Sequence, residues 1–321
     1  TASGTGAMEA AVANVLRRSA KALTVEAGKF GERWGELCEA YGVAVERKKL
    51  EWGHALTPEQ MEDFLREEPG YSAVFLTHSE TSTGVAIDLE AIARAIRRHS
   101  EALIVVDGIT SVGAMPLHMD AWGVDVVVSG SQKGFMCPPG LSFIACSSRA
   151  WEAVERGALP RYYFDLRKAK SSLKDQNTPF TPAISLLTGL DEALAMLISE
   201  GIENVWWRHD RLARATRAAV RALGLELFAE RPSNALTAVK IPEDLRGRDL
   251  VGQLKSRGFI VAGGQAKLKG KIFRISHLGY YDEGDMLAVL AALEDVLRQA
   301  GRPLAPGTAL SAFRKTTTEV Q

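Results

Sequence analysis

The stretch VDVVVSGSQKGFMCPPG, residues 124–140, places a lysine soon after a run of apolar residues. Its valines predict a buried strand, and the Gly and Pro residues that follow predict a turn. A charged amine at the end of a buried strand costs free energy unless another group compensates its charge. The ordinary alternative is a surface lysine in a loop. Lys133 is therefore the first candidate functional residue.

Short β-branched runs alternate with amphipathic helical stretches through the first half of the chain. This alternation predicts an α/β fold in which a mostly parallel sheet has helices on both faces. The runs are almost continuously apolar, as in strands that are buried on both sides. We expect strands at residues 22–27, 43–50, 72–78, 102–107, 124–130 and 142–147, and helices at 31–42, 57–68 and 88–100.

The pattern changes near Thr181, where two long helices are expected at residues 183–201 and 202–224. A chain of 321 residues is longer than one compact core usually holds, so two domains are predicted. The first is a large domain over residues 1–196, and the second is a smaller C-terminal α+β domain with bridging helices over residues 197–321. The tail after Arg302 is expected to be a poorly ordered extension.

Composition excludes several classes of partner. Lys plus Arg and Asp plus Glu balance at 39 each, so no overall charge attracts nucleic acid or an acidic membrane surface. No segment approaches the roughly 20 apolar residues that span a bilayer. Cys38, Cys137 and Cys146 are sparse and lack a CxxC spacing, which argues against a disulfide framework or a metal site and fits a reducing cytoplasm. Small polar metabolites are the expected partners.

Ligands bind at the carboxyl ends of the strands in such sheets. Asp107 ends an almost wholly apolar strand, and Gln132 stands beside Lys133 after another. The hydroxyl-rich turn SETSTG, residues 79–84, follows a third strand. Taken singly, these residues could be ordinary caps and turn formers. Together they place an acid, an amine and several hydrogen-bonding groups at one edge of the predicted sheet.

The N-terminal SGTG loop leads directly into a strong helix. Thr5, Gly6 and Ala7 are therefore expected at a helix N-terminus, whose free N–H groups and dipole favour a phosphate. A plain N-cap is the alternative. Pyridoxal phosphate needs such a cradle, a lysine for its Schiff base and an acid for its pyridinium nitrogen. Burial would also lower the pKa of Lys133 and leave its amine free to attack.

An ordered series of motifs extends over most of the chain. On these motifs the chain resembles the class V, fold-type I pyridoxal-phosphate-dependent aminotransferases, in their alanine–glyoxylate and serine–glyoxylate (serine–pyruvate) branch. The resemblance implies a large cofactor-binding domain, a small C-terminal domain and bound pyridoxal 5'-phosphate. The motifs are SGTGAMEAAVANVL, GKFGERW, THSETSTGV, VVDGITSVGAMPLHMDAWGVDVVVSGSQKGFMCPPGLSFIA, NTPFTPAISLLTGLDEAL and GKIFRISHLGY.

The resemblance assigns roles around the cofactor ring. It implies that Lys133 carries the cofactor as a Schiff base and that Asp107 holds the pyridinium nitrogen. Phe30 falls where the family places an aromatic residue over the ring, and Ile109 falls on the opposite face. Thr81 would meet the oxygen side of the ring. On periodicity alone, Phe30 would be a core residue.

The resemblance also assigns the phosphate contacts. Thr5, Gly6 and Ala7 would bind the phosphate, and Gln132 would add a further contact. In the family a loop from the neighbouring subunit completes this site, and its threonine corresponds to Thr178. A homodimer is therefore expected.

Arg274 is an arginine inside an otherwise apolar strand, and the resemblance assigns it to the carboxylate of the substrate. A guanidinium meets a carboxylate with two parallel hydrogen bonds. An edge-strand arginine facing water is the alternative. The implied reaction moves an amino group from a small amino acid, such as alanine or serine, to a small 2-oxo acid, such as glyoxylate or pyruvate. Lys133 would transfer the Cα proton, and the kinetics would be ping-pong.

The chain departs from the family at two places. The resemblance begins at Thr1, whereas family members carry several dozen residues before this motif, so a fragment or processed form is expected. Asp175 stands where the alanine–glyoxylate branch tends to have an aromatic residue, so the amino donor could differ.

Three other functions stay open. A desulfurase or lyase of the same fold would need a mobile cysteine, but Cys137 lies only four residues after Lys133. A nicotinamide-dependent dehydrogenase would need a G-x-G-x-x-G fingerprint, which the SGTG loop lacks. A non-catalytic subunit of a larger assembly would not require Lys133 and Asp107.

Overall fold

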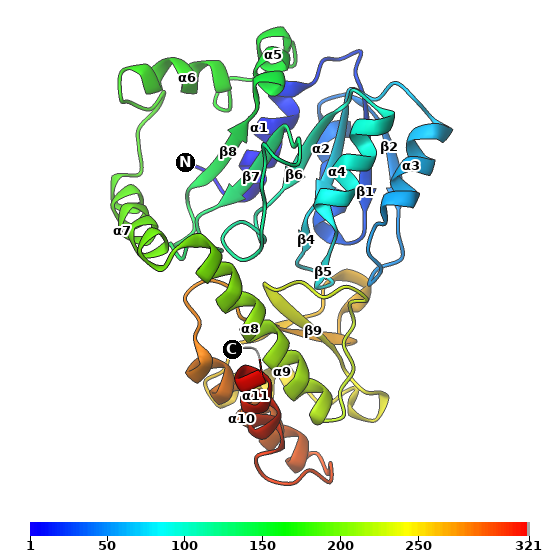
Figure 1. The fold of residues 1–321 in the computed structure, drawn as a ribbon, viewed down its shortest axis with the longest axis vertical. Coiled ribbons are helices and arrows are strands. Elements are labelled where there is room, and N and C mark those ends of the chain that lie inside the picture. The colour runs from blue at the N-terminus through cyan, green and yellow to red at the C-terminus, as the bar shows by residue number, and fades with distance from the viewer. Residues whose placement is uncertain (320–321) are drawn as a thin grey trace.

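The computed structural model describes residues 1–319. An N-terminal part built on a sheet lies above a C-terminal part in Figure 1, and α7 and α8 lead from one to the other. The N-terminal elements are α1 (Gly4–Val15), β1 (Lys21–Glu26), α2 (Lys29–Ala40), β2 (Ala44–Lys49), α3 (Pro58–Glu67), β3 (Ala73–Thr77), β4 (Ser79–Glu80), β5 (Val85–Ala86), α4 (Leu89–His99), β6 (Leu103–Asp107), β7 (Val126–Gly130), β8 (Ser142–Cys146), α5 (Ser148–Arg156), α6 (Leu166–Lys174) and α7 (Ile184–Glu200).

The central sheet has six strands in the order β2-β1-β3-β6-β7-β8. Every neighbouring pair is parallel except β7 and β8, which are antiparallel. Thr77 pairs with Asp107, and Asp107 pairs with Val128. The carboxyl ends of β3, β6 and β7 therefore lie side by side, and the predicted mostly parallel α/β sheet is confirmed.

Helices cover both faces of this sheet. Alternate residues of β6 point to opposite sides: Val105 joins a core with Met8 of α1 and Trp34 of α2. Ile104 belongs to the core on the other face, with Ile92 of α4. Because both faces of β6 are packed against helices, neither face meets water. This explains why its sequence is continuously apolar.

The C-terminal part has its own sheet and core. Its three strands are antiparallel in the order β10-β11-β9, and Phe273 and Leu290 lie in a core that the helices complete. No helix among residues 1–319 is long and apolar enough to cross a membrane. The elements are α8 (Ile202–Ala222), β9 (Leu236–Lys240), η1 (Glu243–Leu245), α9 (Leu250–Ser256), β10 (Ala262–Gly263), η2 (Ala266–Leu268), β11 (Ile272–Ser276), α10 (Glu283–Gln299) and α11 (Thr308–Glu319).

The prediction of a poorly ordered tail after Arg302 was wrong. The segment forms α11, which packs along α8. The buried carboxylate of Glu294 accepts the N–H groups of Gly307 (2.6 Å) and Ala309 (2.8 Å) and so caps the new helix. Ala309 and Phe313 are both fully buried, and their spacing of four residues puts them on one face.

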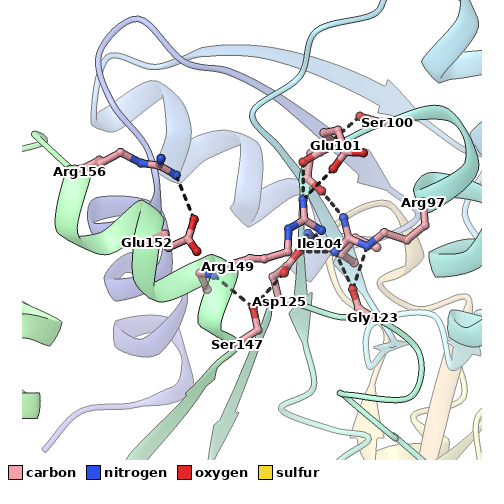
Figure 2. A network of polar contacts seen from close by, with 12 residues as sticks. Arg97, Ser100, Glu101, Ile104, Gly123, Asp125, Ser147, Arg149, Glu152 and Arg156 are labelled. Atoms are coloured by element: carbon pink, nitrogen blue, oxygen red, sulfur yellow. Dashed lines mark hydrogen bonds and ion pairs between the residues drawn. The ribbon is translucent and has the colours of Figure 1, made fainter.

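At the amino end of the central sheet, the buried carboxylate of Asp125 joins several elements by hydrogen bonds, as Figure 2 shows. Asp125 accepts hydrogen bonds from the Ile104 N–H (2.9 Å) and the Ser147 hydroxyl (2.9 Å), and it pairs with Arg97. Arg97 also donates to the carbonyl of Gly123. This network joins β6, β7 and the start of α5 at the edge opposite to the strand ends that carry Asp107.

Because Phe313 is fully buried, Phe313→Ala should lower the free energy of unfolding by about 3–5 kcal/mol, the usual cost of such a cavity. Urea denaturation measures this loss. Ile260→Ala is the control, since Ile260 is 85% exposed and should change stability little. A loss below about 1 kcal/mol for Phe313→Ala would show that α11 does not belong to the core.

Candidate active site

Two turns at the carboxyl edge of the sheet bring Asp107 and Lys133 together. Asp107 is the last residue of β6, and Lys133 lies in the turn that follows β7. The turns touch at Gly134, where an added Cβ would lie 2.1 Å from the Val112 carbonyl oxygen. Only glycine fits this approach, which sets the Lys133 turn against the Asp107 turn. The predicted amine and acid thus share one site.

Asp107 is 4% exposed and accepts one hydrogen bond, from the Ile109 N–H at 2.8 Å. Burial raises the pKa of Asp107 to about 7, and the nearby charge of Glu80 adds to this rise. The Ile109 N–H, Arg33 and Lys133 oppose it. This is the pKa of a buried acid without a bound cation beside it; a positively charged ring nitrogen would favour the ionised form and lower the pKa of Asp107.

Lys133 shows the opposite shift. Burial lowers the pKa of its amine, and the positive charge of Arg274 lowers the pKa further, while Asp107 raises it. A larger share of the amine is neutral at a given pH than in an exposed lysine. A neutral amine is the form that attacks a carbonyl carbon, so the environment suits Lys133 to Schiff-base chemistry.

The first turn of α1 offers free hydrogen-bond donors beside this pair. The helix begins at Gly4, and the N–H groups of Gly6 and Ala7 already bond to the Ser3 carbonyl at 2.8 and 3.4 Å. Within the described residues, the N–H groups of Gly4 and Thr5 keep no partner. Of the three predicted phosphate residues, Thr5 therefore has the donor best placed for an anion, and Ala7 the least suited.

Ile109 and Gln132 lie against the start of α1. A Cβ at Gly4 would come within 2.5 Å of Ile109 Cδ1, and one at Gly130 within 3.0 Å of Gln132 Oε1. Gln132 Oε1 is buried and has no hydrogen-bond partner among residues 1–319. An unsatisfied buried oxygen beside free helix N–H groups fits a site whose ligand completes its hydrogen bonds.

The start of α2 reaches the same place. Arg33 donates from Nη1 to the Thr5 hydroxyl at 2.9 Å, and its guanidinium lies 4.9 Å from the centre of the Phe30 ring. Phe30 is half-buried, so it is not a fully buried core residue. Sequence reasoning missed Arg33. The signal was its position three residues after Phe30, which puts both on one helical face.

Arg274 enters the site from the C-terminal sheet. It lies on β11, the central strand, and is 8% exposed, so the alternative of an edge-strand arginine facing water is wrong. Its Nε and Nη2 donate to the Gly263 carbonyl (3.2 and 2.8 Å), and Nη1 donates to the Thr81 carbonyl (2.8 Å). An arginine has five N–H donors, so one remains on each terminal nitrogen.

Thr81 connects these elements. Its hydroxyl is hydrogen-bonded to that of Thr110 at 2.7 Å, in the turn that follows Asp107. Its carbonyl binds Arg274. Thr81 is therefore positioned between the acid and the arginine, as the predicted role beside the cofactor requires.

Thr178 lies at the surface, in a hollow that it shares with the first turn of α1. It is exposed on the loop between α6 and α7, where its hydroxyl donates to the Phe180 carbonyl at 2.5 Å. Thr178, Gly6 and Ala7 line one hollow of about 500 Å³ on the surface. That Thr178 completes the phosphate site of a neighbouring subunit stays a prediction.

The geometry fits pyridoxal phosphate in four respects. The pKa of the Lys133 amine is lowered toward its neutral form, and Asp107 is a buried acid that accepts one N–H among the described residues. The N–H groups of Gly4 and Thr5 are free within the part of the chain that the structure describes, and the side-chain amide of Gln132, whose Nε2 can donate, lies near them. Together these features suit a ligand with an aldehyde, a basic ring nitrogen and a phosphate.

Comparison with known proteins gives the family. Residues 1–285 match the model of the Aminotransferase class-V family. The chain belongs to the class-V aminotransferases. The resemblance found in the sequence motifs is thereby confirmed, and this family uses pyridoxal phosphate.

Individual relatives cover nearly the whole chain. It is 47% identical over 318 residues to the soluble hydrogenase small subunit of Synechococcus, which covers 97% of this chain and 82% of that protein. It is 38% identical over 323 residues to the serine–glyoxylate aminotransferase of Methylorubrum extorquens, which covers 97% and 80%. The crystal structure of pyridoxamine–pyruvate aminotransferase from Mesorhizobium loti superposes with a TM-score of 0.94 at 29% identity, over 100% of this chain and 83% of the other. The fold-type I aminotransferase fold is confirmed.

The raised pKa of Asp107 predicts a pH dependence of stability in the cofactor-free protein. The folded state binds the Asp107 proton up to about pH 7, whereas the unfolded state releases it near its ordinary pKa of 3.8. The free energy of unfolding therefore falls as pH rises between these values, by at most about 1.4 kcal/mol per pH unit.

Asp107→Asn should remove this contribution, because the amide does not titrate and its oxygen can still accept the Ile109 N–H. Urea denaturation of both proteins from pH 4 to pH 8 measures the difference. Identical pH slopes for the variant and the original protein would contradict the perturbed carboxyl group.

Proposed function

We propose that the protein is a pyridoxal-phosphate-dependent transaminase that moves an amino group from a small amino acid to a small 2-oxo acid, such as glyoxylate or pyruvate. The observation that carries the proposal is the pair formed by half-buried Lys133 and buried Asp107 in turns that touch each other after adjacent strands, with the pKa of the amine lowered and that of the acid raised. The two half-reactions share one site, so ping-pong kinetics are expected.

Lys133 would hold the cofactor covalently and then serve as the base. The amino group of the substrate would displace Lys133 from the cofactor. The freed amine could then take the proton from the substrate Cα and deliver it to the former aldehyde carbon of the cofactor. The bound cofactor supplies an electron-withdrawing ring that stabilises negative charge at Cα. Asp107 would keep the proton on the ring nitrogen, because a carboxyl group that is buried beside a cation holds it by charge and hydrogen bond.

The remaining residues would fix the ring and the phosphate. Phe30 and Ile109 would pack against the two faces of the ring, and Thr81, whose hydroxyl is bonded to that of Thr110, would meet its oxygen side. The start of α1, with Thr5, Gly6 and Ala7 in its first turn, would receive the phosphate. Gln132 would add a contact by donating from its side-chain Nε2 to a phosphate oxygen.

Arg274 would bind the substrate carboxylate. Backbone carbonyls already fix its guanidinium from the N-terminal and C-terminal parts, and one N–H on each terminal nitrogen is left for a ligand. A rigid fork binds a carboxylate with less loss of side-chain entropy than a mobile arginine. Binding at this end orients the substrate so that its Cα–H bond faces Lys133.

Two alternatives lose support. A desulfurase would need a reactive thiolate, but Cys137 is buried and burial raises the pKa of its thiol. A subunit of a larger assembly is suggested by the name of the Synechococcus relative. Such a subunit would not need a lysine and an acid with complementary pKa shifts. Transamination by the purified chain would distinguish an active enzyme from a non-catalytic subunit.

The reaction is tested at Lys133. Treatment of the pyridoxal-phosphate-loaded protein with borohydride should bleach its visible band and attach the reduced cofactor to Lys133, as mass spectrometry of peptides shows. Lys133→Ala should lose more than about 10³-fold in turnover while its circular dichroism and melting temperature stay near those of the original protein. Substantial residual transamination would contradict the mechanism.

Donor identity is tested separately. A panel of alanine, serine, aspartate and ureidoglycine with glyoxylate and pyruvate ranks the substrates by kcat/KM. Asp175→Tyr tests the site at which the chain departs from the family, since a changed ranking would assign donor preference to this loop.

We also propose a homodimer. The helices α6 and α7 stand away from the sheet in Figure 1. Exposed apolar side chains lie on α7, and one lies on α6. Leu173 is 71% exposed, Ile184 70% and Ile198 79%. Exposed apolar patches of this kind mark interfaces, and closed two-fold pairing is the commonest form. A second copy would bring its Thr178 to the phosphate site.

Ile184→Asp and Ile198→Asp should therefore convert the dimer to a monomer and weaken cofactor binding, because a charge at an apolar interface is costly. Analytical ultracentrifugation measures the change. Ile260→Asp, at an 85% exposed position of the C-terminal part, is the control. A dimer that persists in both interface variants would place the interface elsewhere.

Two further points stay proposals. Separate apolar cores support a division into residues 1–196 and 197–321. The cytoplasmic location expected from the cysteines remains a prediction.

A further inference from the structure

Glu80 is a buried carboxylate at the edge of the site to which neither the motifs nor the relatives assign a task. It is the last residue of β4, follows the carboxyl end of β3 and is 2% exposed. A carboxylate is seldom buried so completely without a specific set of partners. The partners of Glu80 indicate what it does.

Among residues 1–319, all five hydrogen bonds of its carboxylate oxygens come from donors. Oε2 accepts the N–H groups of Phe30 (3.1 Å) and Gly31 (2.9 Å). Oε1 accepts the N–H (3.0 Å) and the hydroxyl (2.6 Å) of Ser82, and the Phe30 N–H more weakly at 3.3 Å. The Ser82 hydroxyl in turn accepts the Lys29 N–H at 3.0 Å, so its proton is directed at Glu80. This arrangement suits an ionised carboxylate, because a protonated one would need an acceptor.

These bonds cap α2 from outside. The residue before the helix is Gly28, which has no side chain with which to cap it. A Cβ at Gly28 would lie 2.4 Å from Glu80 Cδ and 2.5 Å from Ser82 Oγ, so the chain accepts this cap only because glycine stands there. The first three N–H groups of α2, from Lys29 to Gly31, all end on Glu80 or Ser82. The position of Phe30 therefore depends on Glu80.

The same turn controls Arg274. The carbonyl of Thr81, the next residue, accepts Arg274 Nη1 at 2.8 Å. Glu80 is also the acidic group whose charge supports the buried guanidinium, since it raises the pKa of Arg274 against the lowering by burial. Glu80 thus bonds to the backbone N–H of Phe30 and lies close enough to Arg274 for the two charges to interact.

We propose that Glu80 is a positioning residue that fixes Phe30 over the cofactor ring and, through the Thr81 carbonyl, orients Arg274 for the substrate carboxylate. The proposal rests on the proposed function, because it assumes that pyridoxal phosphate occupies the site. Glu80 itself touches neither cofactor nor substrate. Its removal should therefore change the geometry of binding rather than delete a reacting group.

The chain offers a matched control. Glu294 is 4% exposed and caps α11 from outside by accepting two N–H groups, as Glu80 caps α2. It lies on α10 in the C-terminal part, and its hydrogen bonds among residues 1–319 are to Gly307 and Ala309. Glu80→Gln and Glu294→Gln therefore remove the same charge from the same kind of cap, and only the first is next to the proposed site.

The holoenzyme test measures the cofactor dissociation constant, the circular dichroism of the cofactor band and the melting temperature. Both variants should lower the melting temperature. Glu80→Gln should raise the dissociation constant about tenfold and alter the sign or size of the cofactor band, because a charged cap is lost beside the ring plate. Glu294→Gln should leave both cofactor readouts unchanged. Equal cofactor readouts for the two variants would overturn the proposal.

A double-mutant cycle shows whether Glu80 acts through Phe30. Phe30→Ala should weaken cofactor binding, and adding Glu80→Gln to it should weaken binding by less than twofold more, since the side chain to be positioned is already gone. Fully additive effects would overturn this route. With substrates, Glu80→Gln should raise the KM of both amino acid and oxo acid by a larger factor than it lowers kcat; an effect on kcat alone would contradict the link to Arg274.

Two outcomes keep the test decisive. If Glu80→Gln fails to fold, Ser82→Ala replaces it, because this variant removes one donor and should raise the cofactor dissociation constant about threefold; an unchanged constant would overturn the proposal. If the original protein binds no pyridoxal phosphate, the proposed function fails and this inference fails with it. Normal binding by the original protein and by both Glu80→Gln and Ser82→Ala would overturn the inference alone.

Discussion

The parallel register of β3, β6 and β7 is the constraint on which the site depends. Thr77 pairs with Asp107 and Asp107 with Val128, so three strand ends reach one edge together. Asp107 is the last residue of β6, and Thr81 and Lys133 lie in the turns beyond β3 and β7. A slip of one residue in β6 would turn Asp107 to the opposite face and separate it from Lys133. The hydrophobic packing on both faces of the sheet prevents that slip and therefore also sets the chemistry.

The two ends of the sheet use buried aspartates in different ways. Asp125 at the amino end is bonded by a charged arginine, a hydroxyl and a backbone N–H, so its bonding is complete (Figure 2). Asp107 at the carboxyl end accepts only the Ile109 N–H among the described residues, and its pKa is raised by burial. Asp125 therefore has a structural role, because its hydrogen bonds hold neighbouring elements together. Asp107 has room for a further partner, and we infer that this partner is a ligand.

Local sequence carried enough information for the sheet and for the residues at its strand ends, because β-branched runs and the rule for parallel strand ends are local signals. Lys133 and Asp107 followed from these signals alone. Glu80 did not, since it sits in a turn whose composition is that of any polar loop and its role arises only when α2 folds against it. The error at α11 has a similar origin: prolines and polar residues suggested a loose tail, whereas Phe313 and the distant cap from Glu294 order it.

Arg274 and Lys133 belong to different sheets, and the contacts between these sheets explain how they can form one site. Besides the bond between Arg274 and Thr81, the hydroxyls of Ser79 and Ser233 meet at 2.7 Å and the Ser233 N–H donates to the Gly84 carbonyl at 2.8 Å. These ties are hydrogen bonds, and none depends on filling a core. The N-terminal sheet can therefore hold Lys133 and Asp107 while hydrogen bonds to the Thr81 and Gly263 carbonyls set the position of the Arg274 guanidinium. If Arg274 binds the substrate carboxylate as proposed, a change in the turn that contains Thr81 should alter which carboxylates bind without disturbing the acid and the amine.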